Sequence, residues 1–534
     1  MNKTTSKSSV IKKLERNAEN GVFYSIYQLY EYYLNGTYVD KNEVKSERYL
    51  LDANNIFSTQ KLELTHIKLQ NFRAFSEIDI KIPDNRLTVI IGNNGGGKST
   101  ILDAISHNMS WLVNRMTKKG GTGESIDDLD LTLGTKAGFS SIITKFKLNN
   151  NIYVDMELVN VRDGFDTSKK SYIKDITKIG NMYKKAKLFN DKVNLPILAY
   201  YTVNRALEAN SKDMASFDET SSIKEVDQFE GYIDSLNGKT DFKYFFRWFK
   251  RLDDIEKHRK IKNDVSFLDQ LNELDKSDLS DEEILKIIKS RSANSNSNSN
   301  SNKIISDIQK IKDSLNNVIQ LFMPGYGNLE IQMEPYLSLT LDKNKQKFNV
   351  LQLSQGEKTL LALVLDISRR LIILNPSLPN PLDGNGIVLI DEFDLHLHPE
   401  WQRNVVRSLS KAFKNCQFIL TTHSPQIIGE VKHNQLIVMK RNDKNEIDYY
   451  QPTQSYGLTS NDILNEIMME NGEKGQLTRT PIVENKLKKI HELIADDKNI
   501  EALSEIEQLE QQINGEIPEL VGAKVDIELA GWDE

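Results

Sequence analysis

A glycine-rich turn between an apolar strand and a helix constrains the fold of this chain more than any other feature. Residues 92–99 read GNNGGGKS and fit the pattern G-x-x-x-x-G-K-[ST]. The β-branched run at 87–91 predicts a buried strand before the turn, and residues 100–105 continue as a helix. Backbone N–H groups and the positive end of the helix dipole then converge on one point, where a phosphate binds. The turn therefore predicts an α/β fold with a P-loop that binds ATP.

The residues of this P-loop have separate expected roles. Lys98 is expected to reach the β- and γ-phosphates of ATP, and Ser99 is expected to hold Mg²⁺. The other expected nucleotide contacts of the loop are Asn93, Asn94, Gly95, Gly96, Gly97 and Thr100.

Two later apolar strands also end in polar residues. Residues 386–390 precede Asp391 and Glu392, which suits a Walker B motif. Asp391 would assist Mg²⁺, and Glu392 would polarise the attacking water as a general base. The run 418–422 ends in His423. The plainer alternatives are that the two carboxylates cap the next helix and that His423 is an ordinary buried histidine.

The stretch 353–358 reads LSQGEK, and with the other three motifs in this order the chain resembles the ABC ATPase superfamily. The resemblance implies that the LSQGE signature of one subunit caps the nucleotide on the P-loop of another. It also makes His423 the catalytic switch histidine and Asp394 the D-loop residue that crosses the interface. One P-loop and one signature then require a head-to-tail homodimer or a higher even-numbered homo-oligomer. The signature residues expected to contact nucleotide are Ser354, Gln355, Gly356 and Glu357.

Two neighbouring features have open alternatives. His396 and His398 could form a metal pair, but a third ligand is not evident, so D-loop residues are favoured. The strand at 198–203 ends in Asn204 and Arg205, which either supply the Q-loop contact or cap the strand.

Composition limits the class of protein. Lys and Arg number 69 against 76 Asp and Glu, a net charge of −7, which excludes a polycationic nucleic-acid coat but leaves local basic patches possible. The single cysteine, Cys416, cannot form an intrachain disulfide. No apolar run approaches the roughly 20 residues of a membrane span, and the first residues lack a signal-peptide core. We therefore expect a cytoplasmic protein without membrane contact.

The spacing of the motifs favours one branch of the superfamily. Ser354 lies 255 positions after Ser99, an insertion typical of the SMC, RecF and OLD-like branch and far longer than in transporter ATPases. The sequence NFRAF at 71–75 resembles the start of those chromosome and defence ATPases. Arg73 within it either approaches the nucleotide or closes the first hairpin.

The insertion contains several distinct sequence patterns. Residues 142–161 alternate as antiparallel strands do, and residues 229–267 favour helix. Aromatic and basic residues alternate at 244–251, and basic residues follow at 257–260. This pattern fits contact with nucleic acid. The favoured interpretation is an amphipathic helix whose aromatic side chains enter the core. The Asn/Ser run at 294–302 predicts a flexible linker, without heptads for a long coiled-coil arm.

These features divide the chain into five expected parts. The parts are an N-terminal helical repeat of SEL type (1–57), an N-terminal ATPase lobe with the P-loop (58–210), a helical insertion with the Asn/Ser linker (211–325), a C-terminal ATPase lobe (326–480), and charged helices with an acidic tail (481–534). A single repeat buries little, so it is expected to pack on the ATPase or on a partner.

The N-terminal repeat together with DLHLHPEWQ at 394–402 and YGLTSNDIL at 456–464 resembles the PtuA family, the ATPases of Septu and retron-associated antiphage systems. This resemblance implies a separate HNH nuclease partner, PtuB. In retron-linked versions it also implies a reverse transcriptase and its DNA–RNA product, so that nucleic acid is reached through the complex.

The expected function is therefore an ATP-hydrolysing regulatory subunit that controls a partner nuclease. No nuclease centre is recognisable in this chain, because neither a Toprim-like acidic cluster nor an H-N-H arrangement is found. The alternatives are a RecF- or SMC-like DNA repair ATPase and an OLD-like nuclease, while the long insertion disfavours an ABC importer subunit.

Overall fold

The computed structural model describes residues 2–530, apart from 59–60, 119, 135–136, 149–151, 166–167, 190–192, 204–226, 239–241, 275–295 and 469–479. Contacts divide the chain into two compact units, Met1–Tyr456 and Gly457–Glu534. The five-part division of the sequence stays a prediction. Within the described ranges, none of the helices combines the length and the apolar composition that crossing a membrane requires.

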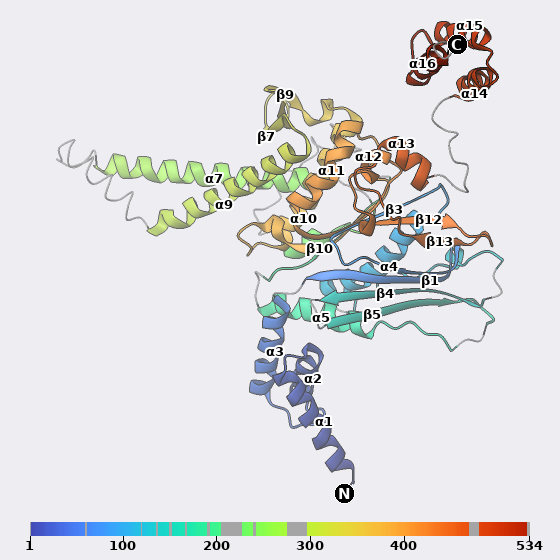
Figure 1. Ribbon diagram of the computed structural model, residues 1–534. Helices are drawn as coiled ribbons and strands as arrows, with labels where there is room; N and C mark the ends of the chain where they lie inside the picture. The colour runs from blue at the N-terminus through green and yellow to red at the C-terminus, as the bar shows by residue number, and fades with distance from the viewer. Residues whose placement is uncertain are drawn as a thin grey trace. The chain divides into compact units, whose positions relative to one another are not determined.

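Six strands of the first unit form a mostly parallel sheet (Figure 1). Their order is β13-β12-β3-β11-β10-β6, and within this sheet β13 runs antiparallel to its neighbour β12. The strands are β3 (Leu87–Gly92), β6 (Ile197–Tyr201), β10 (Asn385–Ile390), β11 (Asn415–Thr421), β12 (Leu436–Arg441) and β13 (Ile447–Tyr450). The central strands are buried along nearly their whole length, as expected for a parallel sheet covered on both faces.

A four-stranded antiparallel sheet in the order β2-β1-β4-β5 packs against it. The strands are β1 (Leu62–Phe72), β2 (Phe75–Lys81), β4 (Phe139–Leu148) and β5 (Ile152–Val161), which confirms the antiparallel strands predicted over 142–161. Gln417 of β11 joins the two sheets, because its side-chain amide exchanges hydrogen bonds with the backbone of Leu64 at 2.7 and 2.9 Å. A third sheet has the order β7-β8-β9, with β7 (Tyr326–Gln332), β8 (Ser338–Lys343) and β9 (Gln346–Asn349).

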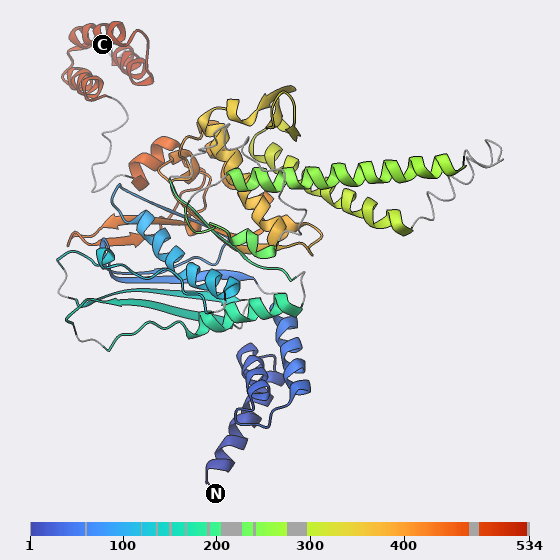
Figure 2. The same cartoon turned by 180° about the vertical axis from the view of Figure 1, so that it is seen from behind.

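Helices cover these sheets (Figure 2). α4 (Lys98–Thr117) contacts strands of both larger sheets, so it lies between them, and α5 (Lys174–Phe189) packs on it. α10 (Gln355–Leu374) is buried along almost its whole length. α11 (Pro399–Ala412) and α12 (Pro425–Ile428) follow the strands that end at the candidate site.

Two long helices, α7 (Phe242–Leu274) and α9 (Asn296–Phe322), lie side by side (Figures 1 and 2). Phe245, Phe246 and Phe249 of α7 are buried, which supports the core interpretation of its aromatic and basic stretch. Helix α9 already begins at Asn296, so the linker prediction is wrong for 296–302, while 294–295 lie outside the described residues. Asn and Ser disfavour a helix only weakly. A helix that has already formed in the following residues can extend backwards through them, because extension costs less free energy than nucleation.

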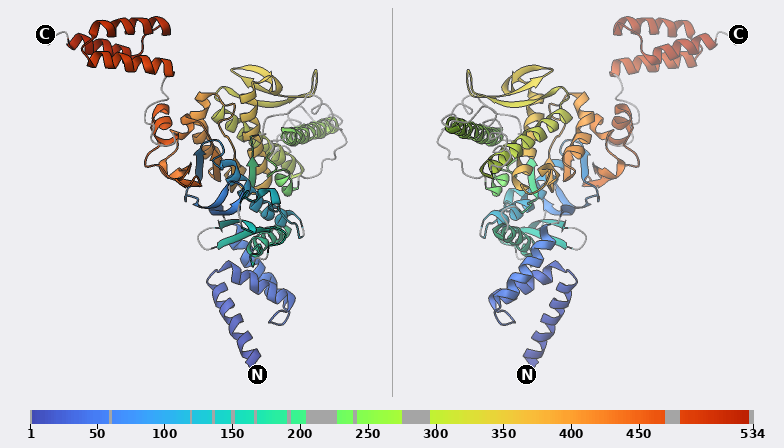
Figure 3. Two further views of the ribbon diagram at one scale, coloured as in Figure 1. Left: turned by 90° about the vertical axis from the view of Figure 1, so that its right-hand side faces the viewer. Right: turned by 90° about the vertical axis from the view of Figure 1, so that its left-hand side faces the viewer.

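The N-terminal residues form three helices, α1 (Asn2–Glu19), α2 (Phe23–Asn35) and α3 (Glu43–Ser58) (Figure 3). Helix α2 ends where Gly36 takes a left-handed conformation, φ +69°, that favours glycine. Its tyrosines pack on the ATPase, because Tyr24 donates to the carbonyl of Tyr153 (2.8 Å) and Lys185 of α5 donates to the hydroxyl of Tyr30 (2.7 Å). The expected packing of this segment on the ATPase is therefore observed.

The second unit holds a bundle of three helices, α14 (Pro481–Ala495), α15 (Asn499–Ile513) and α16 (Pro518–Ala530), after the short helix α13 (Ser460–Ile463). Helices α14 and α15 confirm the charged helices expected in this part of the chain, and α16 is a further helix that the sequence did not indicate. Residues along α16 are apolar on more than one face, so they show no clear helical period. The predicted acidic tail, Trp532–Glu534, lies outside the described residues.

A buried ionic cluster ties α10 to the edge of the parallel sheet. Asp366 accepts hydrogen bonds from Arg369 (2.8 Å), from Arg370 (2.7 Å) and from the hydroxyl of Tyr201 on β6 (2.9 Å). Burial disfavours the carboxylate, but the two arginines outweigh burial and lower the pKa of Asp366 to about 2. Because this pKa lies below the ordinary value of about 4, the ionised Asp366 stabilises the folded chain. This stabilisation is complete above pH 4 and is lost as pH falls towards 2.

We expect Asp366→Ala to destabilise the chain by about 3–5 kcal/mol, because it leaves two buried guanidinium groups without their counter-ion. The measurement is the midpoint of urea unfolding followed by circular dichroism. The matched control is Asp307→Ala on α9, whose ion pair with Lys310 is exposed and is expected to contribute less than about 1 kcal/mol. Equal midpoints for the two variants would contradict the prediction.

Candidate active site

The carboxyl ends of three neighbouring strands form the candidate site. In the sheet, β11 lies between β3 and β10, and all three run parallel. β3 leads into the P-loop, β10 ends immediately before Asp391, and β11 ends immediately before Thr422 and His423. Carboxyl ends of parallel strands share one edge of a sheet, so residues far apart in sequence meet there.

The P-loop depends on glycines that leave no room for side chains. Gly97 precedes α4 with φ +81°, and a Cβ on it would lie 2.3 Å from the ring of Phe75. A Cβ on Gly96 would lie 2.9 Å from the carbonyl oxygen of Asn93. Phe75 belongs to the NFRAF stretch, so the second aromatic of that motif supports the loop from the first hairpin. Residues 93–95 and Ser99 are exposed, and Thr100 is half-buried.

Lys98 is folded into its own loop. Its ammonium group donates to the carbonyls of Gly92 (2.8 Å) and Asn93 (3.0 Å). Burial lowers the pKa of Lys98, while nearby carboxylates, led by Asp391 and then Glu392, oppose the shift. A buried cation in a ring of N–H groups and facing carboxylates is suited to phosphate oxygens and their metal ion.

Thr421, the last residue of β11, holds both Walker B carboxylate residues. Its hydroxyl donates to Asp391 Oδ1 (2.5 Å) and accepts from the backbone N–H of Glu392 (2.7 Å). Its carbonyl accepts from the N–H of Phe393 at 2.8 Å. Glu392 has φ +43°, a conformation that non-glycine residues rarely adopt, and these contacts stabilise it. Asp391 is 3% exposed and donates its own N–H to the carbonyl of Tyr201 at 2.8 Å.

The D-loop carboxylate is bound to the segment that carries His423. Asp394 Oδ1 accepts from the hydroxyl of Thr422 (2.5 Å) and from the N–H of His423 (3.2 Å). Nε2 of His423 is buried and has no hydrogen-bond partner among the described residues. Burial, followed by the charge of Lys98, lowers the pKa of His423, although three carboxylates oppose it. The imidazole is therefore neutral near pH 7 and can accept or donate a hydrogen bond at the free nitrogen.

Mg²⁺ and ATP fit these residues. The glycine cradle excludes side chains, the ammonium group of Lys98 reaches into it, and the buried Nε2 of His423 lacks a partner. Among the described ranges, no group of three or more His, Cys, Asp or Glu side chains is placed to hold a metal ion. A metal here would instead use Ser99, Asp391 and phosphate oxygens, as predicted from the sequence. His396 is exposed, and His398 caps α11, where it accepts from the N–H of Glu400 at 3.4 Å.

The signature stands at the start of a different helix. Ser354 caps α10, and Gln355 begins it. A Cβ on Gly356 would lie 2.1 Å from the carbonyl oxygen of His396, so only glycine allows the signature to approach the D-loop this closely. Within the described contacts, none joins Ser354 to the P-loop of the same chain.

Glu357 of the signature faces the interior of the chain. Its carboxylate accepts from the N–H of Ser354 (2.7 Å), from Lys343 (2.7 Å) and from the hydroxyl of Tyr326. Burial opposes ionisation of Glu357, but these hydrogen bonds, with Lys343 first, lower its pKa to about 2. Its carboxylate is thus placed to hold the signature loop, whereas the sequence analysis expected it to contact nucleotide.

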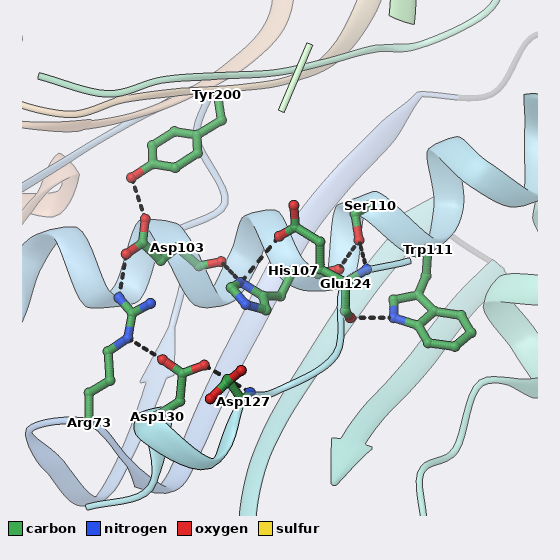
Figure 4. A network of polar contacts seen from close by, with 9 residues as sticks. All are labelled: Arg73, Asp103, His107, Ser110, Trp111, Glu124, Asp127, Asp130 and Tyr200. Carbon is green, nitrogen blue, oxygen red and sulfur yellow. Dashed lines mark hydrogen bonds and ion pairs between the residues drawn. The ribbon is translucent and has the colours of Figure 1, made fainter. Parts of the chain in front are cut away.

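Two roles for Arg73 are open from the sequence: it approaches the nucleotide or it closes the first hairpin. In the structure, two carboxylates bind its side chain (Figure 4). Its guanidinium group bonds Asp130 (2.8 Å) and Asp103, a residue of α4 in the turn after Lys98. Tyr200 of β6 donates to the other oxygen of Asp103 at 2.6 Å. These contacts favour the hairpin alternative, because they fasten the first hairpin to the P-loop helix.

Other predicted positions are less informative. Asn204 and Arg205 lie outside the described residues. Thr421, Thr422 and Phe75 are site residues that were not predicted from the sequence. The two adjacent threonines before His423 were the available signal, because a threonine hydroxyl can both donate and accept a hydrogen bond.

The fold and the site define a P-loop ATPase of the ABC type. The family model described as "AAA ATPase domain" matches residues 63–428. "Retron Ec83 probable ATPase" of Escherichia coli is 37% identical over 458 residues, which cover 82% of each chain. "Retron Vc95 probable ATPase" of Vibrio cholerae serotype O1 biovar El Tor is 32% identical over 481 residues, covering 89% of this chain and 91% of that relative. The chain belongs to the AAA ATPase domain family and to the family of these retron ATPases.

Two further likenesses are partial. "Septu protein PtuA" of Bacillus mycoides (strain KBAB4) is 39% identical over 94 residues, which cover 18% of this chain and 13% of that protein. Among solved structures, the SMC head domain from Thermotoga maritima aligns with a TM-score of 0.36 and 17% identity, covering 73% of this chain and 99% of that one.

We expect Thr421→Val to lower kcat for ATP hydrolysis by about 10- to 100-fold, because it removes a hydrogen bond to a buried carboxylate. The KM for ATP should change little, since the side chain of Thr421 contacts the Walker B segment. Thr421→Ser should restore the rate. The matched control is Thr88→Val on β3, where the hydroxyl of Thr88 is buried without a partner among the described residues. An equal loss in both valine variants would contradict the assigned role.

Proposed function

We propose that the chain binds ATP between two copies of itself, hydrolyses it, and thereby controls a separate HNH nuclease of the PtuB type in a bacterial antiphage complex. The observation that carries the proposal is the shared edge of β3, β11 and β10, which gathers Lys98, Asp391, Glu392 and His423. The signature begins another helix, α10, and no described contact brings its Ser354 to this edge. A second copy can supply the signature that completes the site.

Each residue has a defined part in hydrolysis. Bound MgATP supplies the phosphoanhydride bond that is cleaved. Lys98 would exchange its two carbonyl contacts for phosphate oxygens, and Ser99 and Asp391 would hold the metal ion. Glu392 orients and deprotonates the attacking water, and the neutral imidazole of His423 hydrogen-bonds the transferred group.

The D-loop can report the state of this site to the second copy. Asp394 is bound to Thr422 and to the N–H of His423, and the next residues of the D-loop touch Gly356 of the signature. A shift of His423 on hydrolysis would therefore move both parts of the chain that face the partner copy. A nuclease can respond to the nucleotide only through such a difference in geometry.

The proposed setting follows from the relatives. Two of them are named as retron ATPases and one as a Septu protein. The proposed partners are accordingly the HNH nuclease, and in a retron also the reverse transcriptase and its DNA–RNA product. Contact with nucleic acid would be made through the complex.

The test is a reconstitution with the purified HNH nuclease. The chain alone should hydrolyse ATP and leave DNA and RNA intact, whereas the mixture should cut nucleic acid in a nucleotide-dependent way. Lys98→Ala should lose ATP binding. Glu392→Gln should bind ATP but hydrolyse it at least about 10²-fold more slowly, because it lacks the general base. Metal-dependent cutting by the chain alone, abolished by one substitution within it, would overturn the proposal in favour of an OLD-like nuclease.

Mixing variants tests the composite site. Lys98→Ala and Ser354→Arg should each be inactive alone, and their mixture should regain roughly a quarter of the wild-type ATPase rate, because half of the random dimers hold one intact site of two. The control mixture, Lys98→Ala with Glu392→Gln, should regain nothing, since both defects lie on the P-loop side of the site. Recovery in both mixtures, or a monomer by light scattering with ATP, would exclude the shared site.

A further inference from the structure

Acidic charge in this chain is concentrated in the second unit. Residues 457–534 carry 18 Asp and Glu against 7 Lys and Arg, while residues 1–456 carry 58 against 62. The negative net charge of the whole protein therefore comes from its last 78 residues. Such an asymmetry between units points to different partners for each.

The three-helix bundle of this unit has a core of its own. The core side chains of the three helices are Leu487, Ile490, Ala502, Ile506, Leu509, Leu520, Ala523 and Ile527. Lys489 pairs with Glu505 between α14 and α15 (2.5 Å), and Lys524 pairs with Glu510 between α16 and α15 (2.6 Å). Partly buried apolar side chains pack against this core, so the three helices bury their inward faces on one another.

Helix α16 is apolar on its outward face as well. Val521, Val525 and Leu529 are 44%, 46% and 61% exposed, and their spacing of four residues places them along one side of the helix. We call these three residues the α16 stripe. Asp526 and Glu528 are exposed beside it, and a Cβ on Gly522 would meet open space. The stripe is therefore an open apolar ridge with an acidic margin.

The acidic charge of the second unit indicates which kind of partner can bind the α16 stripe. Carboxylates repel the phosphate backbone, so the unit is unsuited to DNA or RNA. They also repel the same unit of a second copy. A protein segment with apolar anchors and flanking Lys or Arg matches both the stripe and its margin. Enzymes that cut nucleic acid need basic surfaces to hold it, so a nuclease offers this chemistry.

We propose that the α16 stripe docks a basic, apolar segment of the partner nuclease. This inference rests on the proposed function and names the surface that the partner uses. The α16 stripe contains no residue of the ATP site, so substitutions in the stripe test binding of the nuclease without changing a residue of that site.

The test measures the Kd between the full-length chain and the purified HNH nuclease by calorimetry. Val525→Asp with Leu529→Asp should raise the Kd at least about 10-fold, because it places charge where apolar anchors are buried. Asp526→Lys with Glu528→Lys should also weaken binding, and higher NaCl should weaken the wild-type complex. All of these substitutions lie at exposed positions, and the ATPase rate of the chain alone should stay at the wild-type value.

The matched control is Val44→Asp on α3, where the side chain is 78% exposed, and it should bind like the wild type. If the wild type binds and the stripe variants bind equally well, the inference is overturned while the proposed function stands. If the wild type does not bind the nuclease at all, the proposed function itself fails and the inference fails with it. A stripe variant that loses self-association but keeps the nuclease would identify a second copy as the occupant and overturn the inference.

Discussion

The parallel pairing of β3, β11 and β10 is the constraint on which the rest of the structure depends. Ile90 of β3 pairs with Thr421 of β11, and Leu420 of β11 pairs with Ile390 of β10, so the three strands end at one level. A shift of register would separate the carboxylate of Asp391 from the hydroxyl that orients it. The site therefore needs no ligand to bring its residues together, and hydrogen bonds at the strand ends then fix their orientation.

The outer strand β6 connects this edge to the rest of the ATPase. The carbonyl of Tyr201 accepts from the N–H of Asp391, and its hydroxyl donates to Asp366 in the signature helix α10. Its neighbour Tyr200 donates to Asp103 in the P-loop helix α4. One short strand thus touches the Walker B segment, the signature helix and the P-loop helix. These hydrogen bonds hold the three segments in fixed positions relative to one another.

The two compact units differ in net charge. The first unit is close to neutral and directs its basic Lys98 to a phosphate site, whereas the second unit is strongly acidic and exposes an apolar ridge. Acidic charge beside a phosphate site would oppose nucleotide binding, and the acidic excess belongs to the compact unit that does not contain the P-loop. The P-loop and the α16 stripe thus belong to different compact units.

The sequence by itself determined the elements whose signals are local. The P-loop and the strands before Asp391 and His423 are each specified by a few adjacent residues, because strand periodicity and turn chemistry act over short distances. Only the tertiary structure decided the directions of side chains whose partners are far away. Arg73 turned to Asp103 and Asp130, and Glu357 turned to Lys343, since a charge goes to whichever opposite charge the fold brings near. Helix α16 was not predicted for a different reason. Its apolar residues lie on two faces of the helix, so they do not recur with the helical period by which a sequence reveals a helix.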